Sequence, residues 1–272
     1  TMEDSPVKAI RRKPQSSMVV GLNMLKDGEG DLFVSAGNTG ALVVGSRMIL
    51  GRIDGIDRPV LASIYPCLGK EPSLLVDAGA SSEVKAKNLV EYGLMGSVYM
   101  DKILDVQSPR VGLLNVGTEE EKGRELEHET YKLLEKTDVN FIGNVEGRDV
   151  PLGACDVIVT DGFTGNVFLK TVEGMGSFMK KSLKTLFFSS IGGKIGAVFT
   201  MKNIKALSKK MDYKEVGGSP LLGCAKPVIK AHGSSDAKAF MNAARQAKEF
   251  IENNVIEAIT ESLNTVSEEE AQ

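Results

Sequence analysis

The sequence has no tryptophan, only 6% aromatic residues and a net charge of -3 over 272 residues. Few aromatic side chains are available to stack on bases, and a net negative charge does not attract phosphate backbones, so we expect no nucleic-acid partner. No run of 18 apolar residues occurs, which excludes a transmembrane helix. Because 42% of the residues are hydrophobic, the chain can still bury a sizeable core, and a globular protein is expected.

Cysteine and histidine are scarce as well. The three cysteines, Cys67, Cys155 and Cys224, form no C-x-x-C pair, and the only histidines are His128 and His232. This usage is typical of a reducing compartment, so we expect a cytoplasmic protein whose cysteines serve packing. A zinc site would need four ligands from this small set, and neither a P-loop nor a G-x-G-x-x-G pattern occurs. The sequence therefore predicts no metal and no cofactor.

Four segments repeat one pattern: a short apolar run, a polar turn that contains glycine, and a stretch with helical periodicity. We expect the strands of these units at residues 31–35, 73–77, 111–115 and 156–160, and a fifth strand at residues 140–143. Continuous apolar runs that alternate with helices predict buried parallel strands. The sequence therefore predicts an α/β fold of three layers around a mostly parallel sheet.

Polar residues follow each of these strands. The set consists of Ser35, Asn38, Asp77, Asn115, Asn144, Asp161 and Asn166. Because the carboxyl ends of parallel strands converge on one edge of a sheet, we expect the set to line one cleft. Each residue taken singly is better explained as a turn former or a helix cap, and only the set as a whole favours a cleft.

Two of the turns can hold an anion. Residues 37–40 and 162–166 each place small residues and a hydroxyl group at the start of a helix, where backbone amides and the helix dipole favour a phosphate or a carboxylate. One such turn is weak support for a site. Two of them in one chain predict two anionic groups in the same site.

Residues 175–211 contain eight lysines and no acidic residue. Apolar side chains share one helix face and lysines lie opposite, on both sides of a break at Gly192–Gly193. The apolar residues are Phe178, Met179, Leu183, Leu186, Phe187, Met201, Ile204, Leu207 and Met211, and the lysines are Lys180, Lys181, Lys184, Lys202, Lys205 and Lys209. This pattern predicts a helical hairpin on an anionic membrane surface, where each lysine contributes about 1 kcal/mol. A helix pair that packs on its own subunit or in a dimer would need the same apolar stripe.

Near the C-terminus, the run from His232 to Lys238 follows a strand-like segment at residues 227–229. We expect Ser234 or Ser235 to cap a helix that starts at Ala237 and ends near Leu263, with Lys238 in its first turn. A catalytic triad of histidine, serine and aspartate is not supported here, because triad members rarely lie within five residues and no G-x-S-x-G pattern occurs.

These motifs together resemble one family, the bacterial phosphate acyltransferases of phospholipid synthesis. The matching segments are residues 35–41, Arg58–Pro59, 95–99, 109–115, 140–149, 161–166 and 232–238, in order over most of the chain. The resemblance implies transfer of a fatty acyl group from acyl-carrier protein to inorganic phosphate. It also implies a fold like that of phosphotransacetylases and isocitrate or isopropylmalate dehydrogenases, a homodimer, and peripheral association with the inner face of the cell membrane.

The beginning of the chain departs from the family. Its members open with a strand and a turn of the sequence Ala-Val-Asp-Ala-Met-Gly-Gly-Asp, which is absent here, while residues 2–6 and 11–13 match a point well inside them. We therefore expect residues 1–272 to form a single α/β catalytic domain without the N-terminal strand–helix region of the family.

The implied reaction needs a phosphate oxygen to attack a thioester carbonyl, so the protein must supply positioning and oxyanion stabilisation rather than a nucleophile. As catalytic residues we predict His232, Lys238, Asn115 and Asp161. As substrate-binding residues we predict Asn38, Thr39, Gly40, Asn144, Arg148, Thr164, Asn166, Lys170, Ser234 and Ser235.

Each predicted residue has a role that its chemistry allows. Amides at residues 38–40 and 164–166 hold phosphate or the oxyanion, and Arg148 and Lys170 neutralise phosphate charge. Lys238 and His232 do the same or protonate the departing thiolate. The amide and carboxyl groups of Asn115, Asn144 and Asp161 orient these groups. For Arg148 the alternative is a structural ion pair with Glu146 or Asp149.

Two other functions stay open from sequence. One is another enzyme of the same fold, either a small-acyl phosphotransacetylase or a hydroxy-acid dehydrogenase. The dehydrogenase would need a cluster of metal-binding aspartates and a nucleotide loop, for which Asp77 and Asp161 are too few. The other is a non-catalytic module that docks on membranes.

Overall fold

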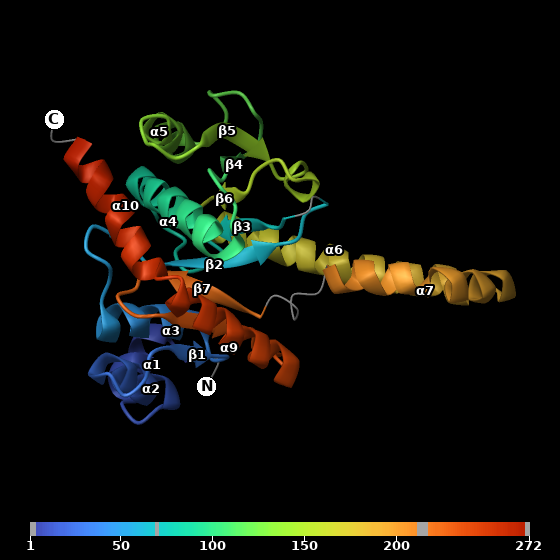
Figure 1. Cartoon of the computed structure of the whole chain (residues 1–272), viewed down its shortest axis with the longest axis horizontal. Helices are drawn as coiled ribbons and strands as arrows, with labels where there is room; N and C mark the ends of the chain where they lie inside the picture. Colours follow the sequence, from blue (N-terminus) through green and yellow to red (C-terminus); the bar gives the residue numbers. More distant parts are fainter. Residues whose placement is uncertain (1–3, 69–70, 211–216, 270–272) are drawn as a thin grey trace.

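The computed structural model describes residues 4–68, 71–210 and 217–269, and in this part of the chain an eight-stranded sheet forms the centre (Figure 1). The strands are β1 (Phe33–Ser35), β2 (Val60–Tyr65), β3 (Ser73–Val76), β4 (Val111–Asn115), β5 (Phe141–Glu146), β6 (Val157–Val159), β7 (Gly218–Leu222) and β8 (Val228–Ala231). They lie in the order β1-β8-β7-β2-β3-β6-β4-β5. Four of the seven neighbouring pairs are parallel and three are antiparallel, which confirms the predicted α/β fold with a mostly parallel sheet.

Strand direction reverses between the two halves of the sheet. β3, β6, β4 and β5 are parallel to one another, and β1 is parallel to β8. The pairings that join these groups, β8 with β7, β7 with β2 and β2 with β3, are all antiparallel. β1 therefore ends at the opposite edge from β3, β4 and β6, and the predicted common edge for all the polar strand ends is wrong. β2 and β7 cause the reversal, and the sequence pattern predicts neither of them.

Helices cover both faces of the sheet and complete three layers. They are α1 (Pro6–Arg12), α2 (Ser17–Asp27), α3 (Thr39–Gly45), α4 (Ala86–Leu104), α5 (Glu125–Leu134), α6 (Gly162–Phe188), α7 (Ile191–Lys210), α9 (Ala237–Glu252) and α10 (Val255–Glu269). A π-helical turn (Ser46–Leu50) follows α3, and a 3-10 turn (Val150–Leu152) precedes β6.

Two hydrophobic cores lie on the two faces, because successive strand residues point to opposite sides. Leu74 and Val76 of β3 pack with Tyr92 and Met95 of α4 and with residues of α9 and α10. Leu75, between them in sequence, packs on the other face, which α2, α3 and part of α6 cover. Full burial of each such side chain contributes about 1.5–3 kcal/mol. The second face is the one that carries the site described below.

The C-terminal helix is interrupted where the sequence predicts one continuous helix to about Leu263. α9 ends at Glu252 and α10 begins at Val255. Asn254 between them has a φ angle of 49°, in the left-handed region that asparagine tolerates better than most residues. The Asn253–Asn254 pair therefore ends α9 and redirects the chain.

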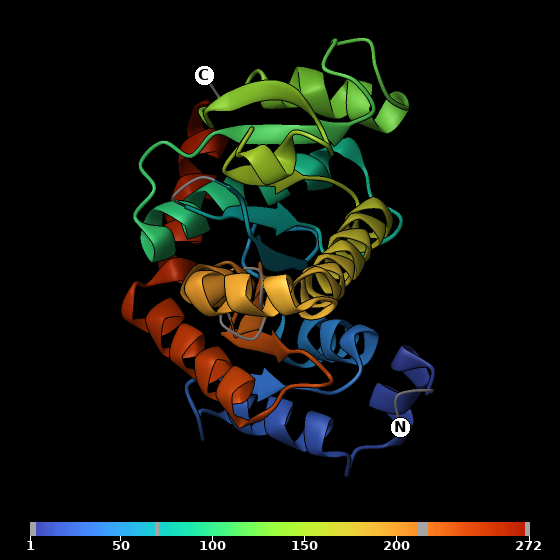
Figure 2. The same cartoon turned by 90° about the vertical axis from the view of Figure 1, so that its right-hand side faces the viewer.

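The predicted hairpin is present as α6 and α7, which project from the body side by side (Figure 1). Figure 2, which looks along the hairpin, shows it between the part with β4, β5 and α5 and the part with β1, α1 and α2. The chain turns at Ser189–Ser190 and not at Gly192–Gly193 as predicted. Gly193 lies so close to the end of α6 that a Cβ atom there would be 2.6 Å from the carbonyl oxygen of Phe187. Glycine is thus needed beside the turn, not in it.

The end of the hairpin is only partly described. The predicted face residue Met211 lies outside the described residues, and so do the side chains of Lys205, Leu207 and Lys209. The membrane-contact prediction can therefore be compared with the structure only up to Ile204.

Candidate active site

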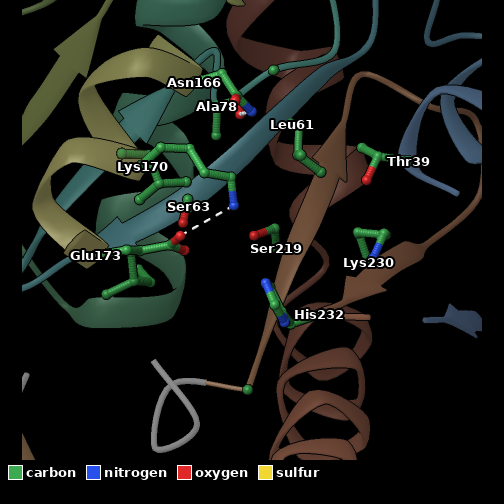
Figure 3. A pocket seen from close by; sticks show the side chains of 15 residues that line it. Thr39, Leu61, Ser63, Ala78, Asn166, Lys170, Glu173, Ser219, Lys230 and His232 are labelled. Carbon is green, nitrogen blue, oxygen red and sulfur yellow. Dashed lines mark hydrogen bonds and ion pairs between the residues drawn. The ribbon is translucent and has the colours of Figure 1, made fainter. Parts of the chain in front are cut away.

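A cavity of about 180 Å³ lies where α6, the start of α3 and the strands β2, β7 and β8 meet (Figure 3). The residues that line it are Thr39, Leu61, Ser63, Ile64, Ala78, Gly79, Asn166, Leu169, Lys170, Glu173, Gly217, Gly218, Ser219, Lys230 and His232. It lies on a face of the sheet and not at the predicted edge. Of the predicted site residues it brings together Thr39, Asn166, Lys170 and His232.

Strand register builds one side of the cavity. Leu61 and Ser63 are two residues apart on β2 and share a face, and Leu61 lies opposite Leu221 of β7. Two residues before Leu221, Ser219 lies opposite Lys230 of β8. Alternation therefore directs Ser63, Ser219 and Lys230 to the same side of the sheet.

Helical spacing builds the other side. Asn166, Lys170 and Glu173 are four and three residues apart on α6 and so share one face. The helix start is held close to the turn after β3: a Cβ atom on Gly165 would be 1.9 Å from the carbonyl oxygen of Asp77. Asn166 adds a hydrogen bond from Nδ2 to the carbonyl oxygen of Ala78 at 3.0 Å. Glycine at 165 thus lets the helix approach the turn that forms the cavity rim.

The turn itself depends on Asp77, which is fully buried. Its carboxylate accepts hydrogen bonds from the amides of Gly79, Ala80 and Ser81, each at 2.8 Å. Burial nevertheless raises the pKa of Asp77 to about 6, against the effect of these bonds. Asp77 therefore positions the rim residues Ala78 and Gly79 without lining the cavity.

The described residues that line the cavity carry more cationic than anionic groups. The ammonium group of Lys170 lies 3.1 Å from the carboxylate of Glu173, and this pair is partly exposed. Lys230 is only 8% exposed. Burial, and then the charge of Lys170, lower the pKa of Lys230. Such a surplus of positive groups suits an anion such as phosphate.

The imidazole of His232 is held in one orientation. Its Nδ1 atom lies 2.8 Å from the hydroxyl of Ser234 and accepts a hydrogen bond from the Ser234 amide at 3.2 Å. Since a backbone amide can only donate, Nδ1 is unprotonated and the neutral ring carries its proton on Nε2. Burial lowers the pKa of His232, Glu173 raises it in part, and Lys170 and Lys230 lower it further. His232 is thus mainly neutral at pH 7 and presents an N–H donor.

The N-terminal amides of α6 are already bonded within the chain. Gly162 donates to the carbonyl oxygen of Ser81 at 2.8 Å, and Gly165 donates to that of Asp161 at 2.9 Å. Phe163 and Thr164 both donate to Oδ1 of Asp161 at 2.9 Å. The predicted anion at this helix start would have to displace these bonds.

The three predicted residues at the start of α3 have different roles: one caps the helix, one packs against α1 and one lines the cavity. Asn38 caps the helix by accepting a hydrogen bond from the Ala41 amide at 2.9 Å. Gly40 lies against α1, where a Cβ atom would be 2.9 Å from Cγ of Pro6. Thr39 alone of the three lines the cavity.

Four other predicted residues form a separate group at the carboxyl ends of β4, β5 and β6, together with Arg124, which the sequence does not single out. We call this group the edge cluster: Asn115, Asn144, Asp161, Thr164 and Arg124. Asn115 donates through Nδ2 to Oδ1 of Asn144 at 3.0 Å. Asp161 receives the guanidinium of Arg124 at 2.6 Å and the Thr164 hydroxyl at 2.7 Å. Burial raises the pKa of Asp161, but the bonds from Thr164 and Arg124 outweigh it and lower the pKa overall. No member of the edge cluster lines the cavity.

The remaining predicted residues lie outside the cavity. Asp236, not Ser234 or Ser235, caps α9 by accepting a hydrogen bond from the Ala239 amide at 3.0 Å, so that capping prediction is wrong. Ser234 bonds His232 instead, and Lys238 is exposed in the first turn of α9. Arg148 is 78% exposed on its side chain and pairs with Glu146 at 2.6 Å, as the ion-pair alternative predicts.

Four lining residues with polar or charged side chains are not predicted from the sequence: Ser63, Glu173, Ser219 and Lys230. Ser63 and Ser219 lie on the two strands that the sequence does not reveal. Glu173 precedes the lysine-rich segment and would be taken for a solvated helix residue. Lys230 does carry a signal, because it is a charged residue in an otherwise apolar strand whose four residues are all buried.

The structure also bears on cysteine chemistry, metal binding and membrane-spanning helices. The three cysteines are buried and unpaired, and burial raises the pKa of Cys155 and Cys224 to about 12, which suits packing and not nucleophilic attack. Among the described residues no cluster of three or more metal-binding side chains is found. Of the helices in the described ranges, none is long and apolar enough to cross a bilayer.

A family profile and individual relatives of known name both match nearly the whole chain. A family profile described as "Fatty acid synthesis protein" matches residues 1–258. A protein named phosphate acyltransferase from Thermoanaerobacter pseudethanolicus is 51% identical over 267 residues, which are 98% of this chain and 80% of the relative. One of the same name from Bacillus licheniformis is 50% identical over 266 residues, 98% of this chain and 81% of the relative.

Solved structures are similar at lower identity. The EutD phosphotransacetylase from Staphylococcus aureus has a TM-score of 0.55 at 16% identity, covering 89% of this chain and 74% of its own. A phosphotransacetylase from Streptococcus pyogenes has a TM-score of 0.54 at 17% identity, covering 90% and 67%. At this identity the likeness concerns the fold, and it confirms the phosphotransacetylase-like architecture expected from the sequence.

Proposed function

Because the chain belongs to the fatty acid synthesis protein family and is therefore an acyltransferase, we propose that it moves a fatty acyl group from acyl-carrier protein to inorganic phosphate in the cavity described above. Relatives about 50% identical are named phosphate acyltransferase. The observation in the structure that carries the proposal is the convergence of Lys170, His232 and Thr39 on one cavity with a cationic surplus.

The reaction requires no group from outside the two substrates. An oxygen of hydrogen phosphate attacks the thioester carbonyl carbon, a C–O bond forms and the C–S bond breaks. The proton of hydrogen phosphate passes to the departing thiolate, so the products are acyl phosphate and the free thiol. The protein contributes orientation and stabilisation of the charge that develops on the carbonyl oxygen.

Three side chains supply this contribution from different elements. Lys170 of α6 neutralises phosphate charge at the cavity mouth, where it is partly exposed and paired with Glu173. The Nε2–H group of His232 donates a hydrogen bond to phosphate or to the oxyanion, and its bonds to Ser234 hold the ring in place. Thr39 adds a hydroxyl donor from the opposite side (Figure 3).

The other predicted residues act by position in this proposal. Asn38 and Gly40 fix α3, and Asn115, Asn144, Asp161 and Thr164 fix the loop and the helix start from which Asn166 and Lys170 project. Ser235 belongs to the turn that carries the imidazole, since its amide donates to the carbonyl oxygen of His232 at 3.0 Å, and Lys238 lies in the first turn of α9, which follows that turn. Residues 1–272 then work as one catalytic domain.

An acyl-transfer assay tests the function directly. The purified chain is incubated with palmitoyl-acyl-carrier protein and phosphate, and acyl phosphate is trapped with hydroxylamine. We expect phosphate-dependent formation of the trapped product and release of the carrier thiol. Acetyl-coenzyme A serves as the parallel substrate: activity with it alone would indicate a small-acyl phosphotransacetylase, and activity with neither would contradict the proposal.

We further propose that the α6–α7 hairpin holds the protein, in the cytoplasm, on the anionic inner face of the membrane. Its outer part exposes Leu186, Ile191, Val198 and Phe199. The predicted contact residues Lys180, Lys184 and Lys202 are exposed as well, whereas Leu183 and Phe187 are half-buried. Apolar side chains that insert, flanked by lysines that face anionic headgroups, are the features of an interfacial helix pair.

Vesicle flotation separates this proposal from a packing role. Leu186→Asp together with Ile191→Asp should release the protein from phosphatidylglycerol vesicles, while turnover with soluble substrate stays unchanged. A second copy of the chain is the alternative occupant of the apolar stripe. If the double variant still floats but changes from dimer to monomer in light scattering, the stripe is a subunit interface.

The homodimer is a separate proposal. Phe240 and Met241 expose a second apolar surface on α9, apart from the hairpin. A pair of copies joined there would leave both hairpins free for the membrane. Phe240→Glu with Met241→Glu should then give monomers in light scattering and leave flotation intact.

A further inference from the structure

Lys230 is a buried lysine for which the described part of the chain provides no carboxylate partner. Its side chain is on the sheet side of the cavity and the residue is only 8% exposed. The ammonium group donates a hydrogen bond to the backbone carbonyl oxygen of Ala231, and no ion pair to it is found within the described ranges. Two other lysines differ from Lys230 in their surroundings. Lys170, which lines the same cavity, is paired with Glu173, and Lys226, four residues earlier in the chain, is exposed.

The strand explains why Lys230 points into the cavity. On β8, Ile229 and Ala231 face α9 and pack with Ala243 and Ala247. Val228 faces the opposite side and belongs to the core beneath α2 and α3. Alternation puts Lys230 on the same side as Val228, where a hydrophobic side chain would continue that core. Instead the core gives way to the cavity at this residue.

The neighbours of Lys230 are donors and small polar groups. Its register partners on the two adjacent strands are Ser35 of β1 and Ser219 of β7. Lys170 and His232 line the same cavity, and Glu173, the one carboxylate among the described lining residues, is already paired with Lys170. Nothing in this group offers a negative charge to the buried ammonium.

Burying an unpaired ammonium is costly, and apolar residues of similar volume are often as stable or more so in such positions. A lysine kept at this place is therefore poorly explained by folding. A ligand that brings negative charge into the cavity would compensate the charge of the ammonium. A phosphate dianion would do so with oxygens that accept from the ammonium and from the hydroxyl of Ser219, which lines the same cavity.

We propose that Lys230 is the residue that binds the phosphate acceptor on the sheet side of the cavity, with its ammonium group in direct contact with the phosphate oxygens. This inference rests on the proposed function for the identity of the anion. Lys230 fixes the nucleophile against the sheet, and Lys170 meets it from α6. In the free protein, burial and the nearby charge of Lys170 lower the pKa of Lys230, and the bound dianion opposes both effects.

Phosphate binding and phosphate kinetics test the role of Lys230. The probe is inorganic phosphate alone, titrated by calorimetry against the full chain, followed by KM for phosphate and for palmitoyl-acyl-carrier protein. Lys230→Met keeps the length of the side chain and removes the charge. We expect it to raise both Kd and KM for phosphate by at least 10-fold while KM for the carrier protein changes less than twofold.

Two further variants control for charge and for folding. Lys226→Met, an exposed position at the other end of the same strand region, should leave phosphate binding unchanged. Lys230→Arg keeps the charge and should retain measurable phosphate binding, unlike Lys230→Met. Because methionine fits a buried site, Lys230→Met should melt at the same temperature as the parent or higher.

The outcomes separate the inference from the function on which it rests. If Lys230→Met lowers the melting temperature and leaves Kd and KM for phosphate unchanged, Lys230 serves the fold and the inference is wrong. If the parent makes acyl phosphate but its KM for phosphate does not depend on Lys230, the function stands and the inference falls. If the parent makes no acyl phosphate yet binds phosphate only when Lys230 is present, the anion site stands and the proposed function falls.

Discussion

The edge cluster and the cavity are built from the same kinds of residue, yet they differ in where the hydrogen bonds go. In the edge cluster, Asp161 accepts from two amides, a hydroxyl and a guanidinium, all from this chain. In the cavity, Lys170 pairs with Glu173 and His232 bonds Ser234, while the one hydrogen bond of the Lys230 ammonium found within the described ranges goes to a backbone carbonyl oxygen. Polar residues at strand ends stabilise the fold when other groups of the chain use up their hydrogen-bonding capacity. They are available for chemistry when a cavity adjoins them.

The largest expected effect tests the structural half of this comparison. Asp161→Ala removes the cap of α6 and the ion pair with Arg124, and we expect it to lower the free energy of unfolding by about 3 kcal/mol. Urea unfolding measures this. Asp161→Asn keeps an acceptor for the amides and should lose less than half as much. Acyl transfer per folded molecule should be within about threefold of the parent, and a loss of more than 100-fold in a folded variant would place Asp161 in the chemistry.

The next effect tests the cavity half. Lys170→Met should lower kcat/KM for phosphate by about 10- to 100-fold, or about 1.4–2.8 kcal/mol in transition-state stabilisation, with little change in melting temperature. The residue is partly exposed, so its removal costs little in folding. Lys132→Met on α5, exposed and far from the cavity, is the matched control. If Lys170→Met and Lys132→Met were equally active, the cavity would be no more important for the reaction than the edge cluster.

Titration of His232 tests, without any substitution, whether phosphate binds in the cavity. Burial first, and then the nearby lysines, lower the pKa of His232 in the free protein. The unfolded chain therefore takes up this proton first on acidification, so the fold loses stability as the pH falls through the ordinary histidine range. A phosphate dianion in the cavity should move the pKa of His232 upward in NMR titrations. The signals of His128, whose ring bonds the carbonyl oxygen of Glu121, should not respond to phosphate.

The smallest expected effect concerns Arg148. Its guanidinium is exposed and pairs with Glu146 on the same loop, and such exposed pairs contribute about 0–1 kcal/mol. Arg148→Lys should leave KM for phosphate within twofold and the melting temperature nearly unchanged. A KM raised 10-fold at unchanged stability would instead confirm the phosphate role that its sequence motif suggests.

The sequence pattern was sufficient for the elements that form continuous apolar runs. β3, β4 and β6 lie where Leu74, Leu113 and Ile158 predict buried strands, and the basic segment is the predicted hairpin. β7 escaped because Gly218, Ser219 and Pro220 hide its strand character. That omission had a large consequence, because β7 and β2 reverse the direction of the sheet and move the site from an edge to a face.

The candidate site shows the same limit at the level of single residues. Thr39, Asn166, Lys170 and His232 were found because they follow strand ends or belong to polar motifs. Whether a capping residue such as Asp161 has bonding capacity left for a ligand depends on contacts with Arg124, 37 residues away in the chain. Spacing along a sequence does not contain that information.

α6 runs for 27 residues from the cavity to the turn of the hairpin, and Glu173 is its last residue that lines the cavity. Gly174 and Gly176 follow at once, in the interior of the helix, where glycine weakens it by about 0.5–1 kcal/mol each relative to alanine. The tip lies about 27 Å beyond Lys170 at 1.5 Å per residue. On the proposed membrane-bound arrangement, these two glycines would form a flexible section between the cavity and the tip, so that the tip could tilt while Lys170 and Glu173 keep their places. Alanine at both glycines would stiffen that section, and on the same proposal acyl transfer would then differ between vesicle-bound and free protein.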